Sequence, residues 1–478
     1  MPDDLPLRPA HRLAAEMAAG SVSPVELVDA CLERIERIDG GINAFVVVLA
    51  EQARAQARES EARLRAGRGR PLEGVPIPIK DEMAVAGVPM TFGSAMATPL
   101  PSPVDGEPVA RLRAAGAVFL GKTTLPELGT VPTTEGRLLG ACHNPWDRSR
   151  TAGGSSGGAA AAVAAGMAPV AHGSDGGGSL RIPASCCGLF TVKPSRGRIS
   201  RAPLIGDTPL GLVTDGFITR SVLDNALLLD AVQGPAPGDP SWAPPPARPY
   251  ADEVATPPGR LRIGWTAVPP IDTFVDPACA AAVADAAELC ASLGHQVVEL
   301  TPEWRSEALL PDFLQVWAAT IGWVVELLAP SGGGTSALEP HNRALWEAGR
   351  ATPVTTYLTT MTRLQTYARR VLAAWREVDV LLTPSLAEPP LPLGTIFEGV
   401  DADPLSPVTR AAVFTPFTPL VNVTGQPAAS LPLAWHDGLP VGVQAIGRPA
   451  DEATLFRLSA QLEQARPWAG RLPPPEAR

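Results

Sequence analysis

Apolar positions near the start of the chain follow a helical period. Leu27, Cys31 and Ile35 fall on one helical face directly after residues 23–26, Ser-Pro-Val-Glu. That tetrapeptide is a capping box with proline at the first helical position. A second amphipathic stretch, rich in charged residues, runs from about residue 43 to 66. The pattern predicts two helices in this part of the chain.

Farther along, short apolar runs typical of strands alternate with helical stretches. The runs cover residues 75–79, 118–120, 261–265, 297–300, 380–382 and 441–446. The clearest helix begins at Asp276-Pro277 and ends at Leu293, where Gly294 is a stop signal. Strands that alternate with helices in this way are typical of layered α/β domains.

The domain organisation follows from these patterns. We expect residues 1–70 to form a helical segment that packs on the core, and residues 71–478 to form one large α/β domain. Residues 235–258 are rich in proline, which predicts a long surface connection inside that domain.

Composition and charge narrow the possible partners and cofactors. A net charge of −10 over 478 residues argues against a nucleic-acid surface, which needs clustered Lys and Arg. The six cysteines show no zinc-binding spacing, so we expect no metal and no cofactor, and we expect the adjacent Cys186 and Cys187 to be buried thiols. The acidic N-terminus resembles no signal peptide, and no apolar run reaches 18 residues. We therefore expect a cytoplasmic protein without a membrane segment.

Lysine is scarce in this chain, which makes its positions informative. Only Lys80, Lys122 and Lys193 occur, and arginine supplies every other Lys/Arg cation. Lysine can lose its proton when it is buried, whereas arginine keeps it. A lysine that is kept in such a chain is therefore a candidate base.

Two glycine-serine runs carry the most unusual composition. Residues 153–158 (GGSSGG) precede an alanine-rich helix, and residues 173–179 (GSDGGGS) end on Ser179. Consecutive glycines before a serine expose backbone N–H groups beside a hydroxyl, as an oxyanion hole requires. A glycine-rich helix start, a phosphate-binding nest and the GxSxG elbow of Ser-His-Asp hydrolases remain alternatives. For the last alternative, His172, His295, His341 and His436 lie downstream, in no telling context.

These segments resemble the amidase signature family. The resemblance covers residues 74–81 (GVPIPIKD), 153–200, 422–428 (NVTGQPA) and 438–444 (GLPVGVQ), in the same order and with similar spacing. It extends over nearly the whole chain and weakens between about residues 303 and 376. The resemblance implies an α/β/α layered domain around a central mixed, mostly parallel β-sheet, with residues 303–376 as a variable substrate-cleft region.

The same resemblance implies a role for each residue of the site. Ser179 matches the nucleophile, Ser155 the serine held by a cis peptide bond, and Lys80 the base. Three glycines, Gly176, Gly177 and Gly178, match the oxyanion-hole segment, and Asp175 and Arg181 match residues that brace it. Gly176 departs from the family pattern, where Thr or Ile is more usual. The departure predicts a looser oxyanion hole or a wider acyl site.

We expect the substrate to be a small molecule with an amide or carbamate bond. The resemblance is closest to hydrolases of cyclic oligoamides, aryl amides and urethanes. Aromatic and apolar residues outside the shared motifs are expected to line the cleft, namely Met90, Phe92, Phe313, Trp317 and Phe414. A glutaminase subunit of a tRNA-dependent amidotransferase and a catalytically silent binding protein are the alternatives. The assembly is expected to be a monomer or a homodimer.

Overall fold

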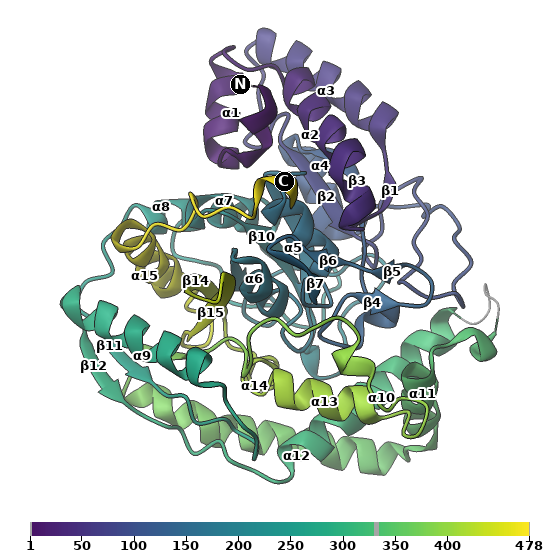
Figure 1. The fold of residues 1–478 in the computed structure, drawn as a ribbon, viewed down its shortest axis with the longest axis vertical. Coiled ribbons are helices and arrows are strands. Elements are labelled where there is room, and N and C mark those ends of the chain that lie inside the picture. Colours follow the sequence, from purple (N-terminus) through teal and green to yellow (C-terminus); the bar gives the residue numbers. More distant parts are fainter. Residues whose placement is uncertain (1, 329–333, 478) are drawn as a thin grey trace.

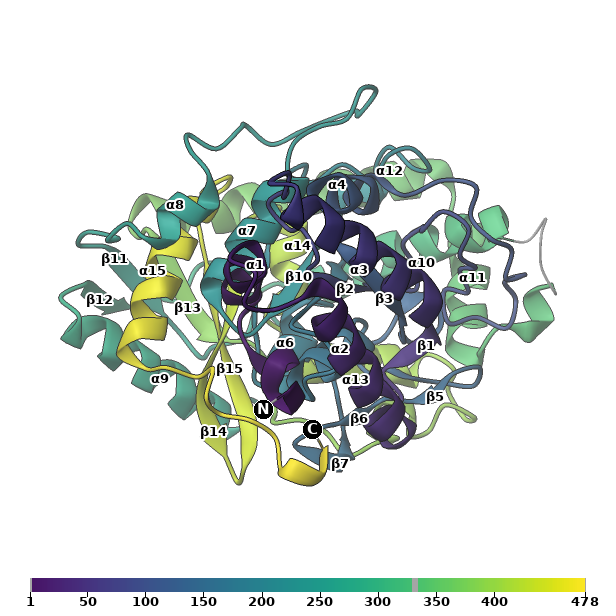
Figure 2. The ribbon, with the colours of Figure 1, turned by 90° about the horizontal axis from the view of Figure 1, so that it is seen from above.

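A computed structural model describes residues 2–328 and 334–477 of the chain. Residues 329–333 fall inside the predicted variable region 303–376 and lie outside the described residues, as do residues 1 and 478. Figures 1 and 2 show the fold from two directions at right angles.

The elements occur in the following order along the chain. The helices are α1 (Ala10–Ala18), α2 (Pro24–Ile38), α3 (Ala50–Arg65), α4 (Glu107–Ala115), α5 (Gly157–Ala164), α6 (Arg181–Cys187), α7 (Val222–Val232), α8 (Tyr250–Val254), α9 (Pro277–Ser292), α10 (Leu309–Leu328), α11 (Pro340–Ala351), α12 (Val354–Leu372), α13 (Ser406–Phe414), α14 (Thr418–Thr424) and α15 (Glu452–Ala465). The strands are β1 (Phe45–Val48), β2 (Pro76–Lys80), β3 (Val118–Thr123), β4 (Glu135–Gly136), β5 (Gly140–Ala141), β6 (His143–Asn144), β7 (Asp147–Thr151), β8 (Val170–Asp175), β9 (Phe190–Lys193), β10 (Thr214–Thr219), β11 (Arg262–Trp265), β12 (Gln296–Glu299), β13 (Val380–Pro384), β14 (Ala428–His436) and β15 (Leu439–Ile446).

The large central sheet has the order β12-β11-β13-β15-β14-β9-β10-β8. The expectation of a layered α/β domain with a mixed sheet is confirmed, but the expectation of a mostly parallel sheet is wrong. Only the β12-β11 and β11-β13 pairs are parallel, and the other neighbours in this sheet are antiparallel. A helical crossover such as α9 brings its flanking strands parallel, whereas the tight turn between β14 and β15 forces an antiparallel hairpin.

Both faces of the central sheet are buried, which explains the continuous apolar runs in its strands. In β14, Ala429 and Leu431 belong to the main hydrophobic core, which also contains residues of α6 and α9. Ala428, its neighbour in the strand, belongs to a second core with residues of α12 and α14. Since successive side chains of a strand point to opposite faces, helices cover both faces of the sheet.

Most of the predicted elements are present, with some changes. The capping box at Ser23 and Glu26 begins α2, and Asp276 caps α9. The stretch 43–66 is not all helix, because β1 precedes α3. The proline-rich residues 235–258 form an irregular connection that ends in the short helix α8. No helix within residues 2–328 or 334–477 is both long and apolar enough to cross a membrane.

A smaller three-stranded sheet brings the N-terminal part of the chain to the centre. Its order is β1-β3-β2, with β2 parallel to β3. Apolar side chains of α1 to α3, such as Leu13, Leu27 and Ala53, share the main core with β2 and β8. Helices α1 to α3 lie together at the top of Figure 1, and the green helices α10 to α12 lie along the bottom. Strand β2 packs beside β8, and this contact brings two distant segments of sequence into one site.

Candidate active site

Lys80 is the last residue of β2 and is completely buried. Its Nζ lies 2.8 Å from Ser155 Oγ and 2.9 Å from Ser174 Oγ, and both serines are also buried. The Gly154–Ser155 peptide bond is cis, as the family resemblance implied. The structure therefore brings the predicted base and the predicted bridging serine together, although 75 residues separate them in sequence.

Burial lowers the pKa of Lys80, because an ammonium is poorly stabilised away from water. The carboxylates of Glu82 and Asp215 act in the opposite direction and are outweighed. Glu82 Oε1 is 3.6 Å from Lys80 Nζ. An amine with a lowered pKa can be neutral at lower pH and can accept a proton from a hydroxyl.

Ser179 follows β8 through a short glycine segment, and its side chain is largely buried, with 9% of the residue exposed. Asp175 holds this segment in place. One of its oxygens accepts the Gly178 N–H at 2.7 Å, and Arg181 donates to both oxygens, at 2.8 and 2.9 Å. Burial alone would raise the pKa of Asp175, but the adjacent Arg181 guanidinium reverses the effect and lowers it. The bracing role predicted for Asp175 and Arg181 thus has a matching set of contacts.

The backbone N–H groups of the glycine segment differ in what they contact. The Gly178 N–H is used by Asp175, so it cannot serve an oxyanion. Within the described residues, the Gly177 and Ser179 N–H groups donate to no protein atom. Of the predicted oxyanion-hole glycines, Gly178 is therefore a bracing residue, while Gly177 has an available donor beside Ser179.

Gly176 is closely surrounded by two side chains, so a larger residue there would have to displace them slightly. A Cβ added there would lie 3.1 Å from Trp317 and from Val213, closer than ordinary van der Waals contact. The Trp317 indole fills the space that a Thr or Ile side chain would take. The expectation of a looser oxyanion hole or a wider acyl site at Gly176 stays a prediction.

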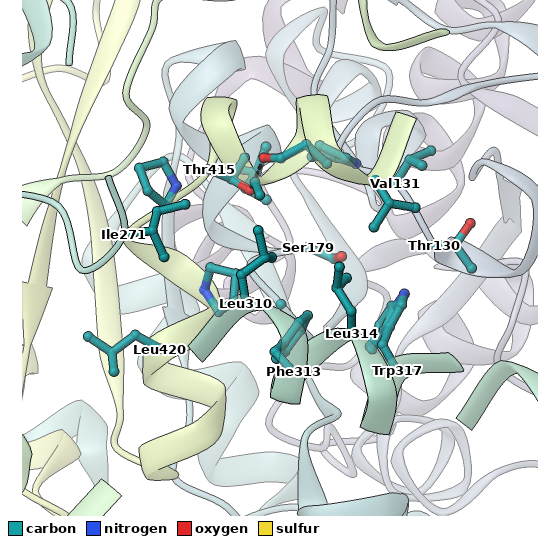
Figure 3. Close-up of a pocket in the computed structure, with 18 of the residues that line it drawn as sticks. Thr130, Val131, Ser179, Ile271, Leu310, Phe313, Leu314, Trp317, Thr415 and Leu420 are labelled. Atoms are coloured by element: carbon teal, nitrogen blue, oxygen red, sulfur yellow. Dashed lines mark hydrogen bonds between the residues drawn. The ribbon is translucent and has the colours of Figure 1, made fainter. Parts of the chain in front are cut away.

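Two cavities meet at Ser179. We call the first the apolar chamber; Val131, Ile182, Leu310, Phe313, Leu314 and Leu420 line it. Figure 3 shows Ser179 near its centre, with Phe313, Leu314 and Trp317 projecting from α10. The Phe313 and Trp317 rings are stacked, with their centroids 5.7 Å apart. No charged side chain of the described residues lines this chamber.

We call the second cavity the charged chamber; Glu82, Met90, Phe92, Ser155, Arg201 and Trp323 line it. Ser174, Ser179 and Trp317 are also part of its wall. Ser155 lines this chamber and is absent from the described lining of the apolar one. The two sides of Ser179 are therefore chemically different.

Four of the five predicted cleft residues line these cavities. Met90 and Phe92 line the charged chamber, Phe313 lines the apolar chamber, and Trp317 lies between them. Phe414 does not contribute to either, because it is completely buried in the main core at the end of α13. Aromatic composition alone could not separate a core residue from a cleft residue.

The other two lysines are also buried. Lys122 Nζ lies 2.9 Å from Asp81 Oδ1 and donates to the Met83 carbonyl at 2.8 Å. Lys193 donates to the Pro194 carbonyl, and burial lowers its pKa to about 7. Neither lines the two chambers, so scarcity alone does not identify the base.

Among the described residues, no histidine or cysteine lines either chamber. His172 Nε2 faces Asp215 Oδ1 at 3.4 Å, and His341 lies against Thr130. All six cysteines are buried and free, including the Cys186–Cys187 pair. Across residues 2–328 and 334–477, no three or more His, Cys, Asp or Glu side chains are grouped as metal ligands would be.

Sequence reasoning missed three polar residues around Lys80, namely Ser174, Glu82 and Arg201. For Ser174, the sequence carried one signal. Side chains alternate along β8, so Ser174 lies on the same face of the strand as the polar residue His172. Glu82 is only two residues after Lys80, but its approach depends on the turn that follows β2. Arg201 comes from a distant loop, and the sequence carried no signal for it.

Comparison with known proteins shows the family of this chain. The model of the Amidase family matches residues 26–456. The chain belongs to the amidase family. It is an enzyme that hydrolyses amide C–N bonds.

Individual relatives cover the enzyme from end to end. AmiB2 of Mycobacterium tuberculosis is 42% identical over 99% of both chains. A solved structure of 6-aminohexanoate cyclic dimer hydrolase superposes with a TM-score of 0.92 and 35% identity, covering 99% of this chain and 100% of that one. A bacterial aryl acylamidase of the amidase signature enzymes gives a TM-score of 0.87 and 27% identity, covering 97% and 99%. The predicted family resemblance and fold are therefore confirmed.

Proposed function

We propose that the enzyme cleaves amides through an acyl-enzyme on Ser179, with Ser155 as proton relay and Lys80 as base. The observation that carries the proposal is the 2.8 Å contact between the buried Lys80 Nζ and Ser155 Oγ, because Ser155 shares a cavity wall with Ser179. A serine hydroxyl attacks an amide only when a neighbour takes its proton. A desolvated lysine is suited to this step.

In the first step, Ser179 Oγ forms a bond to the amide carbon. Its proton passes to Ser155 Oγ, and the Ser155 proton passes to the neutral Lys80 amine. The oxyanion that forms accepts hydrogen bonds from the Gly177 and Ser179 N–H groups; one such donor is worth about 3–4 kcal/mol. The C–N bond then breaks, and the proton returns from Lys80 through Ser155 to the leaving nitrogen. Water releases the acid from Ser179 by the same relay.

The two chambers suggest which part of the substrate lies where. The leaving nitrogen has to face Ser155, and Ser155 lines the charged chamber. The acyl group therefore occupies the apolar chamber, whose wall includes Phe313 and Leu314. We propose amides of medium-length apolar acids as substrates, with anilides as convenient probes. A zwitterionic acyl donor such as glutamine would find no charged partner among the described residues of that chamber.

Release of p-nitroaniline from hexanoyl p-nitroanilide tests the proposal. Ser179→Ala and Lys80→Arg should each abolish turnover, the latter because guanidinium keeps its proton. Ser292→Ala, an exposed serine on α9, is the matched control and should retain full activity. A fluorophosphonate probe should label the wild type and the control, but not Ser179→Ala. Retained turnover in Lys80→Arg would contradict Lys80 as the base, and hydrolysis of glutamine alone would favour a glutaminase.

A further inference from the structure

Near Lys80 lies a largely buried cluster of polar groups, Glu82, Arg201, Asp215 and His172, of which Glu82 and Arg201 line the charged chamber. Arg201 Nε is 3.6 Å from Asp215 Oδ2, and His172 Nε2 is 3.4 Å from Asp215 Oδ1. These separations are at or beyond the long end of hydrogen-bond distances. Arg201 therefore faces the Asp215 carboxylate without a direct hydrogen bond.

Arg201 stands out in this cluster. Its side chain is only 10% exposed, yet its Nε and Nη1 donate no hydrogen bond to any group in the described chain. A guanidinium has N–H donors in a fixed planar fork, and buried donors nearly always have an acceptor. Nε and Nη1 are themselves buried, while Arg201 as a residue forms part of the wall of the charged chamber, so the chamber wall contains a guanidinium that the described chain leaves partly without acceptors.

We propose that Arg201 binds a neutral carbonyl oxygen on the amine side of the substrate, that is, a second amide, carbamate or urea group. This inference rests on the proposed function, because Ser155 places the leaving amine in the charged chamber. Arg201 would then determine substrate specificity, because it would favour amides whose amine part carries a second carbonyl group.

The charge balance distinguishes a carbonyl from a carboxylate ligand. Asp215 and Glu82 already place two carboxylates near the single Arg201 guanidinium. The positive charge of Arg201 is therefore compensated without a further anion. A third carboxylate would be repelled by both. A carbonyl oxygen accepts from the guanidinium without adding a charge.

The rest of the chamber suits the chain between the two carbonyl groups. Met90, Phe92 and Trp323 line the cavity together with Arg201. An apolar wall with a few convergent polar groups is typical of small-molecule sites, where the polar groups fix the orientation. A hydrocarbon spacer would pack on the apolar side chains while its distal carbonyl reaches the guanidinium.

Three substrates with the same hexanoyl group test the proposal. Their amines have equal chain length and end in a methyl group, an N-methylamide or a carboxylate, and hexanoate release is measured over a series of spacer lengths. The wild type should prefer the N-methylamide over the methyl-ended substrate by about 10- to 100-fold in kcat/KM, the range for a hydrogen bond to a charged group. In Arg201→Gln this ratio should fall to near 1, and Arg201→Lys should keep part of it. Arg305→Gln, an exposed arginine outside the chamber, should leave the ratio as in the wild type.

Three outcomes would overturn the inference. In the first, the wild type shows no preference for the N-methylamide at any spacer length. In the second, it prefers the carboxylate-ended substrate. In the third, Arg201→Gln loses kcat/KM equally on all substrates, so the ratio of N-methylamide to methyl-ended substrate is unchanged. The wild-type ratio tests the idea even if a variant fails to fold. Failure of the wild type to cleave any of these amides or the anilide would instead reject the proposed function.

Discussion

Substitution of methionine for Lys80 or for Lys122 should have different main effects, on activity in one case and on stability in the other. Lys122 forms a buried pair with Asp81 at 2.9 Å and donates to a backbone carbonyl. Lys80 faces two hydroxyl groups at hydrogen-bond distance and a carboxylate at 3.6 Å. Lys122→Met should therefore destabilise the fold, whereas Lys80→Met should mainly remove activity.

The magnitude follows from what each substitution leaves behind. Lys122→Met leaves Asp81, only 1% exposed, as an uncompensated buried carboxylate, and breaking such a pair costs about 3–5 kcal/mol. Lys80→Met removes two contacts to hydroxyls, about 1 kcal/mol each, but also relieves the burial of an amine whose pKa is lowered by desolvation. We expect a net change of at most about 2 kcal/mol for Lys80→Met.

Urea unfolding followed by circular dichroism measures the difference at pH 8. The double variant Lys122→Met with Asp81→Asn removes both charges, and asparagine can still accept the Thr91 N–H that Asp81 accepts. It should recover most of the lost stability and should turn over the anilide, while Lys80→Met stays inactive. A larger loss of stability in Lys80→Met than in Lys122→Met, or turnover by Lys80→Met, would refute the assignment of the two lysines.

Three further predictions concern the same site. Because burial lowers the pKa of Lys80 and the neutral amine is the active form, kcat/KM should rise with pH and be lost as the pH falls through that pKa. Glu82→Gln removes a carboxylate that favours the ammonium, so the rising limb of the pH profile should move to lower pH; a move to higher pH would contradict this. Gly176→Thr should lower stability by about 1–3 kcal/mol through contact with Trp317, measured as a thermal midpoint, and adding Trp317→Ala should restore part of it. No recovery in that double variant would place the strain elsewhere.

The amino-acid sequence alone determined the local features of this enzyme. The cap at Ser23 and the signals around α9 act within a few residues, so they could be read without the fold. The family motifs at residues 74–81 and 153–200 predicted Lys80, Ser155 and Ser179 as the catalytic residues, since motif order and spacing are themselves properties of the sequence. The same holds for the family, which the comparisons confirm.

Only the tertiary structure decided which distant groups meet. The direction of each strand depends on how its neighbours are connected in space, so the mostly antiparallel sheet was not predicted. Phe414 and Phe313 are both aromatic residues of weakly patterned segments, but packing buries one and exposes the other to the apolar chamber. Arg201 lies 121 positions after Lys80 in sequence, and only the fold places it beside Asp215 of β10 and in the wall of the chamber. Contacts over such sequence separations depend on the whole fold, because no local propensity encodes them.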